Sequence, residues 1–459
     1  MVRVRKLNSK ALTYDQKIAA GRSLRDKTGR TMHAGWKAPA RRIDPVQILI
    51  DSSEGRMPEL VPIRYTRMMQ NPFAFYRGAA AIMAADLAHT PVSGIRVQAC
   101  GDCHLMNFGA FATPERRVVF DINDFDETLP APWEWDVKRL AASFVIAARH
   151  NKFHKWDAKN AASKCVQSYR KHMLDFSKMA VLDRWYARID IEDLIAKLYD
   201  RSVRKRIQKR LEKESARTVV EHDFPKLAIL KAGKPRIKDN PPTIFHLPES
   251  DHAAFQKVLV NAFQEYVETL SDDRKALLSH FEMHDFAIKV VGVGSVGTRC
   301  GILLLGAGNN DPLFLQVKEA RYSVLERYAG KSVYSNRGER VVNGQRLMQS
   351  ASDLFLGWTE ARDGRHFYVR QLRDMKISPM VELFEEDTLA QYAEFCGWAL
   401  ARAHAKSGDA AMISGYIGNS DRFDQAVASF AVDYADQNEK DHDSLLIAIR
   451  AGKIEIARE

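Results

Sequence analysis

The segment that most restricts the possible folds is FAIKVVGVGSVGTRCGILLLGAGNNDPLFLQVKEA, at residues 286–320. Three apolar stretches alternate there with two glycine-containing turns, which is the pattern of three consecutive antiparallel strands. A helical pattern at 339–355 and two further apolar stretches, at 355–361 and 366–374, follow it. We therefore expect a five-stranded antiparallel sheet with one helix, placed late in a chain of 459 residues.

The rest of the chain is mainly helical in pattern. Helical periodicity covers about 44–90, where Pro91 ends it, and resumes from Trp135 to about Lys213. Short strands are expected at 95–100 and 116–124. The sequence thus predicts an α+β protein divided into a basic, irregular arm, a helical part with two short strands, a Pro-rich linker, the small sheet and a helical tail: 1–45, 46–223, 224–250, 251–384 and 385–459.

Composition narrows the setting. No apolar run approaches the roughly 20 residues that a membrane span requires, and the basic first 30 residues lack the apolar core of a secretory signal. Five scattered cysteines do not suggest a disulfide framework, so we expect a cytoplasmic protein. The net charge is +11, and the basic run at 201–217 is more typical of a solvated helix face than of a nucleic-acid site.

The first glycine turn of the sheet, VGVGSVGTRC, has the spacing G-x-G-x-x-G. A dinucleotide-binding loop needs a helix after the glycines, whereas a strand follows here. Kinases use such a hairpin to lay backbone N–H groups over the phosphates of ATP, and a plain β-hairpin is the alternative. The candidate nucleotide-binding residues of this turn are Gly292, Gly294, Ser295 and Gly297.

One basic residue, Lys318, interrupts the apolar strand LFLQVKEA, 21 residues after Gly297. A buried lysine is costly without a partner, so this position suits a lysine that pairs with phosphate; an edge-strand lysine that reaches solvent is the alternative. We expect a carboxylate from the next helix to meet it. Glu339 is the first candidate, with Glu319 and Glu326 as alternatives.

The decapeptide CGDCHLMNFG, at 100–109, carries the most concentrated polar chemistry. Asp102 and Asn107 lie in a loop after a strand, and Asp124 follows in NDFDE. Phosphoryl transfer needs a carboxylate that orients the attacking hydroxyl, here Asp102, and oxygen ligands for Mg²⁺, here Asn107 and Asp124. We expect His104 to hold the loop through a hydrogen bond to a carbonyl or carboxylate.

Three other readings of this decapeptide fit less well. A redox C-x-x-C normally opens a helix, but this one ends a strand. A zinc site would need a second pair of Cys or His ligands. A metallophosphoesterase would need a G-N-H-[DE] segment, and GNND and GNSD both lack the histidine.

These loops resemble the catalytic and metal loops of the aminoglycoside phosphotransferase and choline kinase group, which read H-G-D-x-H-x-x-N, then I-D-[FW], then W-D. Asp102, His104 and Asn107 fall on the first pattern, Asp124 with Phe125 on the second, and Trp135 with Asp136 on the third. The resemblance implies that Asp102 is catalytic and that Asp124, rather than Asp121, is the metal ligand. Cys100 departs from the histidine usual in that group.

The order of the motifs differs from ordinary kinases, because the glycine turn and its lysine follow the catalytic loop. A helix at 396–409 also resembles the segment that leads into that loop, so the resemblance implies a circularly permuted, two-lobed, protein-kinase-like fold. In the alternative, 76–87 is the lead-in helix. Over most of its length the chain also resembles a bacterial family catalogued as domain of unknown function 2252.

The activity that these motifs imply is ATP- and Mg²⁺-dependent phosphoryl transfer to a hydroxyl of a small molecule. A kinase-like transferase of AMP, a protein kinase and a nucleotide-binding regulator without catalysis are the alternatives. The acceptor is not identified, and neither a membrane nor a nucleic acid is expected as a partner. Four side chains precede the catalytic loop on helical segments: Arg64, Arg67, Tyr76 and Arg77. We favour a role for them at the helix surface or in ion pairs, and contact with a substrate anion is the alternative.

Overall fold

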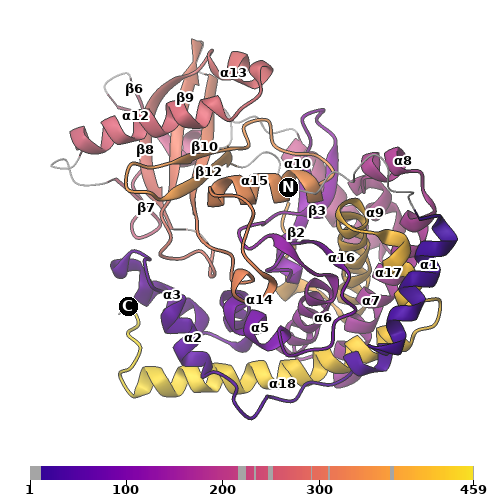
Figure 1. Ribbon diagram of the computed structural model, residues 1–459. Coiled ribbons are helices and arrows are strands. Elements are labelled where there is room, and N and C mark those ends of the chain that lie inside the picture. Colours follow the sequence, from indigo (N-terminus) through magenta and orange to yellow (C-terminus); the bar gives the residue numbers. More distant parts are fainter. Residues whose placement is uncertain are drawn as a thin grey trace.

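The computed structural model describes residues 12–215, 224–231, 234–246, 252–290, 292–308, 311–372 and 377–457. An antiparallel sheet forms one region, and a larger helical region lies below it in the view of Figure 1. The mixed α+β content expected from the sequence is confirmed.

The sheet has six strands in the order β11-β12-β10-β9-β8-β7, and every neighbouring pair is antiparallel. Five are the expected ones: β8 (Glu282–Lys289), β9 (Cys300–Ala307), β10 (Asp311–Ala320), β11 (Gly357–Glu360) and β12 (His366–Gln371). The expected helix is α15 (Arg337–Met348). Residues 373–374 of the last expected strand lie outside the described ranges.

The expected linker at 224–250 is instead part of the sheet region, wherever the structure describes it. It forms β5 (Ala228–Lys231), β6 (Lys234–Ile237) and β7 (Ile244–Phe245), and β7 pairs with β8. Residues 232–233 and 247–250 are outside the described ranges. Prolines and glycines here shape short strands and turns, so composition alone did not separate a hairpin from a linker.

Alternating side chains of the central strands pack on opposite faces of the sheet, as the two-residue strand period requires. Leu303 and Leu305 join a cluster with Tyr266 of α12 (His252–Glu268) on one face. Ile302 and Leu304 join a cluster with residues of β5 and β6 on the other. Lys318 is three residues beyond Leu315 on β10, at the end of the strand nearest the glycine turn.

The helical region is built around four long helices. α6 (Trp133–His150) packs on α7 (Lys155–Lys178), α16 (Glu386–Ser407) packs on both, and α18 (Arg422–Arg450) runs along the edge of the pair (Figure 1). The remaining helices are α1 (Tyr14–Ser23), α2 (Pro45–Asp51), α3 (Val61–Met68), α4 (Pro72–Gly78), α5 (Ala80–Leu87), α8 (Val181–Tyr186), α9 (Ile191–Lys197), α10 (Arg201–Ser215), α11 (Phe224–Leu227), α13 (Asp272–Leu278), α14 (Glu326–Ala329) and α17 (Ala410–Ile417).

The first 45 residues are not an irregular arm where the structure describes them. Thr13 and Gln16 form a capping box that begins α1, and α1 packs on α17. Gly21 lies so close to the backbone of Met412 that a Cβ would clash with its carbonyl oxygen. Residues 1–11 of the expected arm lie outside the described ranges.

Two short ladders place the polar loops. β1 (Arg96–Ala99) pairs with β4 (Leu129–Pro132), and β2 (Phe108–Ala112) pairs with β3 (Val118–Ile122). The loop at 100–107 joins β1 to β2, and the turn at 123–128 joins β3 to β4. The two therefore meet at one end of both ladders, where the Asn123 amide donates to the Asn107 carbonyl at 2.8 Å.

Across the described ranges, no helix has both the length and the apolar character of a membrane span. All five cysteines are free and buried, which confirms the expectation of no disulfide framework.

Candidate active site

Side chains of helix α6 hold the loop at 100–107 by accepting hydrogen bonds from its backbone. The Asp136 carboxylate accepts hydrogen bonds from the backbone N–H groups of Cys100 at 2.6 Å and Gly101 at 3.0 Å. Two turns further along the helix, Ser143 Oγ accepts from the Leu105 amide at 3.0 Å. Asp136 therefore holds the start of this loop in place.

A second residue of α6, Arg139, holds the side chain of Asp102. Its Nε donates to Asp102 Oδ1 at 2.8 Å, and its Nη2 donates to the same oxygen. Burial alone would lower the pKa of Arg139, but Asp102 and Tyr76 outweigh it and raise that pKa. Asp102 Oδ1 thus accepts both hydrogen bonds from Arg139, whereas Oδ2 remains available to another partner. Arg139 was not among the expected site residues, although its position three residues after Asp136 places both on one helix face.

The two other polar residues of the loop, Asn107 and His104, differ in their contacts with Asp102. Asn107 lies in a 3-10 turn (Leu105–Asn107), and its Nδ2 donates to the Asp102 carbonyl at 2.6 Å, so its Oδ1 carries no structural bond. His104 Nε2 is 3.9 Å from Asp102 Oδ2, too far for the expected hydrogen bond, and its buried Nδ1 has no partner. Burial lowers the pKa of His104 to about 3, so the ring is neutral at pH 7.

The turn after β3 meets Lys318 of the sheet. Lys318 Nζ donates to Asp126 Oδ2 at 2.7 Å and lies 3.9 Å from Asp124 Oδ1. Tyr368 of β12 donates to the other oxygen of Asp126 at 2.5 Å. Burial alone would lower the pKa of Lys318, but the two carboxylates outweigh it and hold the pKa above its ordinary value. Lys318 is therefore a buried, paired lysine and not a solvated edge residue.

The structure gives Lys318 a different partner from the expected Glu339. Glu339 lies in the first turn of α15, where its N–H is capped by Asn336, whereas the carboxylates that meet Lys318 are those of Asp124 and Asp126. The next residue, Arg340, instead reaches the turn and donates to the carbonyls of Asp126 at 2.8 Å and Thr128 at 2.6 Å. The alternatives are engaged elsewhere, Glu319 with Arg299 and Glu326 with Arg340.

The glycine turn lies between β8 and β9, as the sequence indicates, and it reaches over the same carboxylates. Ser295 Oγ donates to Asp126 Oδ2 at 3.3 Å. Gly297 has φ +85°, and a Cβ there would press on Arg56. Arg56 in turn donates to the carbonyls of Gly294 at 3.0 Å and Val296 at 2.5 Å, so the turn is held close to the helical region.

Two cavities meet at this point. The first, of about 550 Å³, is lined on the sheet side by Lys318, Gln316 and Arg370. The second, of about 600 Å³, is lined by Asp102, His104, Asn107, Asp126, Gly294 and a group of arginines. Asp124, Gly292 and Ser295 line both cavities. Most of the sequence-predicted residues thus gather around one junction, with Lys318 on one side, Asp102 on the other and Asp124 between them. Gly297 and Glu339 line neither cavity.

Asp121, the alternative to Asp124 as a metal ligand, is fully buried and paired with Arg402. Its second oxygen also accepts from the Ser350 amide and hydroxyl, each at 2.8 Å. Both oxygens of the Asp121 carboxylate are thus used in contacts that stabilise the fold. Asp124, by contrast, has a side chain 36% exposed, and it faces the two cavities.

The cysteines of the loop are not placed for redox or zinc chemistry. Burial raises the pKa of the Cys103 thiol well above its ordinary value, which suppresses the thiolate that either chemistry needs. In the part of the chain that the structure describes, no group of three or more His, Cys, Asp and Glu side chains is arranged to hold a metal ion.

Glu127, beside these carboxylates, gives a testable pH dependence. Burial raises its pKa to about 7, although Oε2 accepts from the Val324 amide at 2.7 Å. Because the folded pKa is above the unfolded value near 4.5, the neutral acid favours folding at low pH, and stability falls as pH rises through about 7. We expect Glu127→Gln to raise Tm relative to the wild type at pH 8 and to change it little at pH 5. Thermal unfolding of both proteins across this range is the measurement, and an equal difference at both pH values would contradict it.

The fold and the cavities define an α+β protein in which two polar loops of a helical region face a lysine-bearing antiparallel sheet (Figure 1). The chain matches the family described as "Uncharacterized protein conserved in bacteria (DUF2252)" over residues 56–448, and it belongs to that family. No curated protein and no solved structure is significantly similar to it.

Proposed function

We propose that the protein transfers a phosphoryl group from Mg²⁺-ATP to a hydroxyl of a small molecule. The observation that carries the proposal is the meeting of two cavities at Asp124, with Lys318 lining one and Asp102 lining the other. A transferase for two substrates needs this arrangement, because the group that moves must lie between a donor pocket and an acceptor pocket.

The first cavity suits the nucleotide. A kinase-like site has a glycine hairpin over the phosphates, a lysine on the third strand and a helix after that strand. Here the hairpin joins β8 to β9, Lys318 is on β10, and α15 follows and contacts β10. Lys318 is paired with Asp126, so ATP phosphates would share a lysine already held in place by a carboxylate.

The oxygen donors at the junction suit Mg²⁺. The free Oδ1 of Asn107 and the exposed carboxylate of Asp124 are hard ligands, and Mg²⁺ commonly takes only one or two protein ligands besides water and phosphate oxygens. Lys318 Nζ bonds Asp126 rather than Asp124, which leaves the Asp124 oxygens available. When bound there, Mg²⁺ would neutralise charge on the phosphates.

Asp102 is placed to act on the acceptor. Arg139 fixes its Oδ1, so Oδ2 on the second cavity can accept the proton of an attacking hydroxyl. The acceptor oxygen then bonds to the γ-phosphorus as the bond to the β,γ-bridging oxygen breaks, and ADP leaves with that electron pair.

The permuted chain order is part of this proposal. The last turn of α16 lies against β1, the strand that enters the catalytic loop, and Ser407 Oγ accepts from the Gln98 amide at 3.2 Å. His404 of the same helix contacts Asp136 at 3.2 Å. A helix that supports the catalytic loop thus comes from the far end of the chain, as a circular permutation of a kinase-like fold requires.

Thermal unfolding with and without Mg²⁺-ATP tests the donor site. A ligand at about 100 times its Kd stabilises by about 2.7 kcal/mol, which for a chain of this length is a rise in Tm of about 3 °C. We expect this rise in the wild type and in Asp183→Asn, a matched exposed aspartate on α8. We expect it to vanish in Asp124→Asn and when Mg²⁺ is omitted.

The products of Mg²⁺-ATP turnover test the transfer itself. ADP as the nucleotide product supports phosphoryl transfer, whereas AMP bound to an acceptor, with release of pyrophosphate, contradicts it and favours the AMP transferase. A shift in Tm that survives in Asp124→Asn, or no shift with any nucleotide, would overturn the donor site.

A further inference from the structure

The second cavity carries more positive charge than the donor chemistry needs. Six arginines line it. Arg365 pairs with Asp363, and Arg337 lies over the ring of Tyr322. The other four come from segments far apart in the chain: Arg56, Arg64, Arg77 and Arg321. Lys318 does not line this cavity, and none of the four lines the first one. We refer to these four residues as the arginine cluster.

No member of the arginine cluster forms an ion pair with a carboxylate of the described residues. Carboxylates act on it only at longer range, Asp102 and Glu382 on Arg77 and Glu127 on Arg56. Arg56 donates to the carbonyls of Ser52, Gly294 and Val296, and Arg321 donates to those of Ser52 and Glu54. Arg64, which is 2% exposed, donates to the Gly78 carbonyl and to Ser53 Oγ. These neutral acceptors satisfy N–H groups but leave the charges uncompensated, which is costly in a partly buried site.

Four of the five carboxylates on the same cavity are engaged by other groups, and the fifth, Asp124, forms no ion pair with the cluster in the described part of the chain. Asp102 is held by Arg139, Asp126 by Lys318, and Glu319 by Arg299. Glu127 accepts from the Val324 amide, and its pKa is raised by burial to about 7. The cluster therefore presents net positive charge to whatever fills the cavity.

Arg77 is the member least explained by the fold. It lies on α4, which Asn71 caps and Pro72 begins, so its backbone is fixed. Its Nε is buried without a hydrogen-bond partner among the described residues, and its guanidinium carbon lies 5.9 Å from the centre of the Phe73 ring. A guanidinium held beside Asp102 with its donors unused is poised for a ligand that accepts hydrogen bonds.

Burial lowers the pKa of Arg77, brings that of Arg64 to about 10 and lowers that of Arg56 well below its ordinary value. Because a guanidinium keeps its proton at pH 7 in proteins, the cluster keeps its charge.

We infer that the arginine cluster binds an oxyanion, a phosphate or carboxylate group, carried by the acceptor substrate. This inference rests on the proposed function and names the acceptor class: a small hydroxyl compound that already bears such a group. The cluster and Asp102 line the same cavity, so an acceptor anchored by its anion presents a hydroxyl to Asp102. The nucleotide phosphates have their own cation, Lys318, in the first cavity.

Inorganic phosphate and malonate are suitable probes, because they carry the anion without the rest of the acceptor. We expect phosphate, malonate or both to raise the Tm of the wild type above its value in potassium chloride of equal ionic strength, by about 3 °C near saturation. We expect Arg77→Gln to lose this rise. Phosphate also stabilises proteins by exclusion from their surface, and the comparison of variants removes that general effect.

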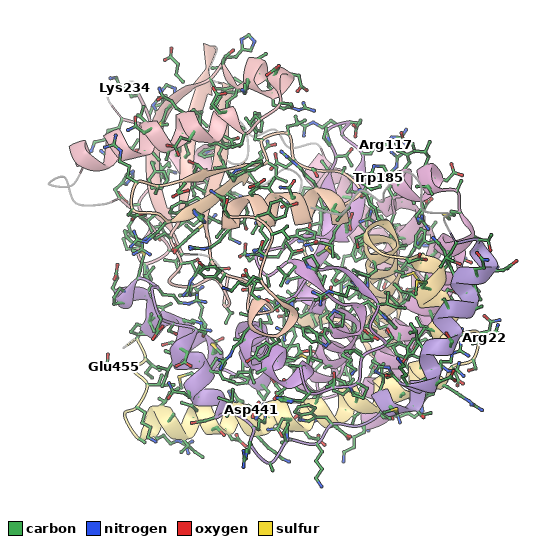
Figure 2. The ribbon with its side chains drawn as sticks, in the orientation of Figure 1. Arg22, Arg117, Trp185, Lys234, Asp441 and Glu455 are labelled. Atoms are coloured by element: carbon green, nitrogen blue, oxygen red, sulfur yellow. The ribbon has the colours of Figure 1, made fainter. Side chains whose placement is uncertain are left out.

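Arg22→Gln is the matched control, since Arg22 is exposed on α1, at the margin of the helical region away from the sheet (Figure 2). It should keep the full response. In chloride alone, Arg77→Gln should unfold at or above the wild-type Tm, because it removes a partly buried charge that forms no ion pair among the described residues. A Tm several degrees lower in chloride would mean that Arg77 supports the fold, and would overturn the inference.

These variants distinguish the proposed nucleotide site from the proposed anion site. Arg77→Gln is expected to keep the Mg²⁺-ATP response, and Asp124→Asn to keep the phosphate or malonate response. Loss of the Mg²⁺-ATP response in Arg77→Gln would assign the cluster to the nucleotide and overturn the inference. The absence of any anion effect on the wild type, or an equal effect in Arg77→Gln, would also overturn it. An anion effect lost in Arg77→Gln, in a protein that ignores Mg²⁺-ATP, would uphold the anion site and reject the donor site.

Discussion

Asp102→Asn is expected to reduce turnover of Mg²⁺-ATP by a factor of about 10²–10⁴ and to leave the Mg²⁺-ATP shift in Tm intact. The amide of the new side chain keeps one acceptor oxygen, which Arg139 would hold, as it now holds Oδ1. The group left facing the cavity is then an NH₂, which cannot accept the proton of an attacking hydroxyl. Nucleotide binding is preserved because Lys318 and Asp124 are unchanged.

Release of ADP from Mg²⁺-ATP, with water as acceptor, measures this loss before the natural acceptor is identified. Asp183→Asn again serves as the control. The substitution also removes the counter-charge of buried Arg139, so a lower Tm is expected alongside the lost turnover. Turnover within a factor of two of the wild type, in a protein that still binds Mg²⁺-ATP, would exclude Asp102 as the base.

The elements that the sequence predicts well are those set by local pattern. Alternating apolar residues and glycine turns indicated β8, β9 and β10, and the long periodic segments indicated α6 and α7. β7 was missed because two residues after a pair of prolines carry no periodicity, and only their pairing with β8 makes them a strand. α1 was missed because its residues are mostly exposed, and its order comes from a capping box and from packing on α17.

The candidate site also combines residues that a local pattern predicts with contacts that depend on distant parts of the chain. The spacing of Asp102, Asn107 and Asp124 could be read from the chain, because all three lie within 23 positions. The partner of Lys318 could not, since Asp126 is 192 positions away and a local rule pointed to the helix that follows. The arginine cluster also joins segments that are distant in sequence, and only the folded chain shows that no carboxylate meets it.

Asp121 and Asp124 lie on the same strand and turn, three residues apart, and the structure predicts opposite consequences of replacing them. Asp121→Ala is expected to lower the free energy of unfolding by about 3–5 kcal/mol, because it strands the guanidinium of Arg402, which has no exposed surface, and also removes the acceptor for Ser350. For a chain of this length that corresponds to a fall in Tm of about 3–5 °C. Asp124→Asn, at a cavity surface, should change Tm in the absence of ligand far less.

The double variant Asp121→Ala/Arg402→Met separates a stranded charge from a simple loss of packing. If the uncompensated guanidinium is the main cost, removing it as well should recover part of the lost stability, so the double variant should unfold at a higher temperature than Asp121→Ala alone. A double variant less stable than the single one would mean that Arg402 contributes through its bond to the Met348 carbonyl instead. An Asp121→Ala protein as stable as the wild type would reopen Asp121 as a candidate metal ligand, since a carboxylate that the fold does not need would then lie three residues from Asp124.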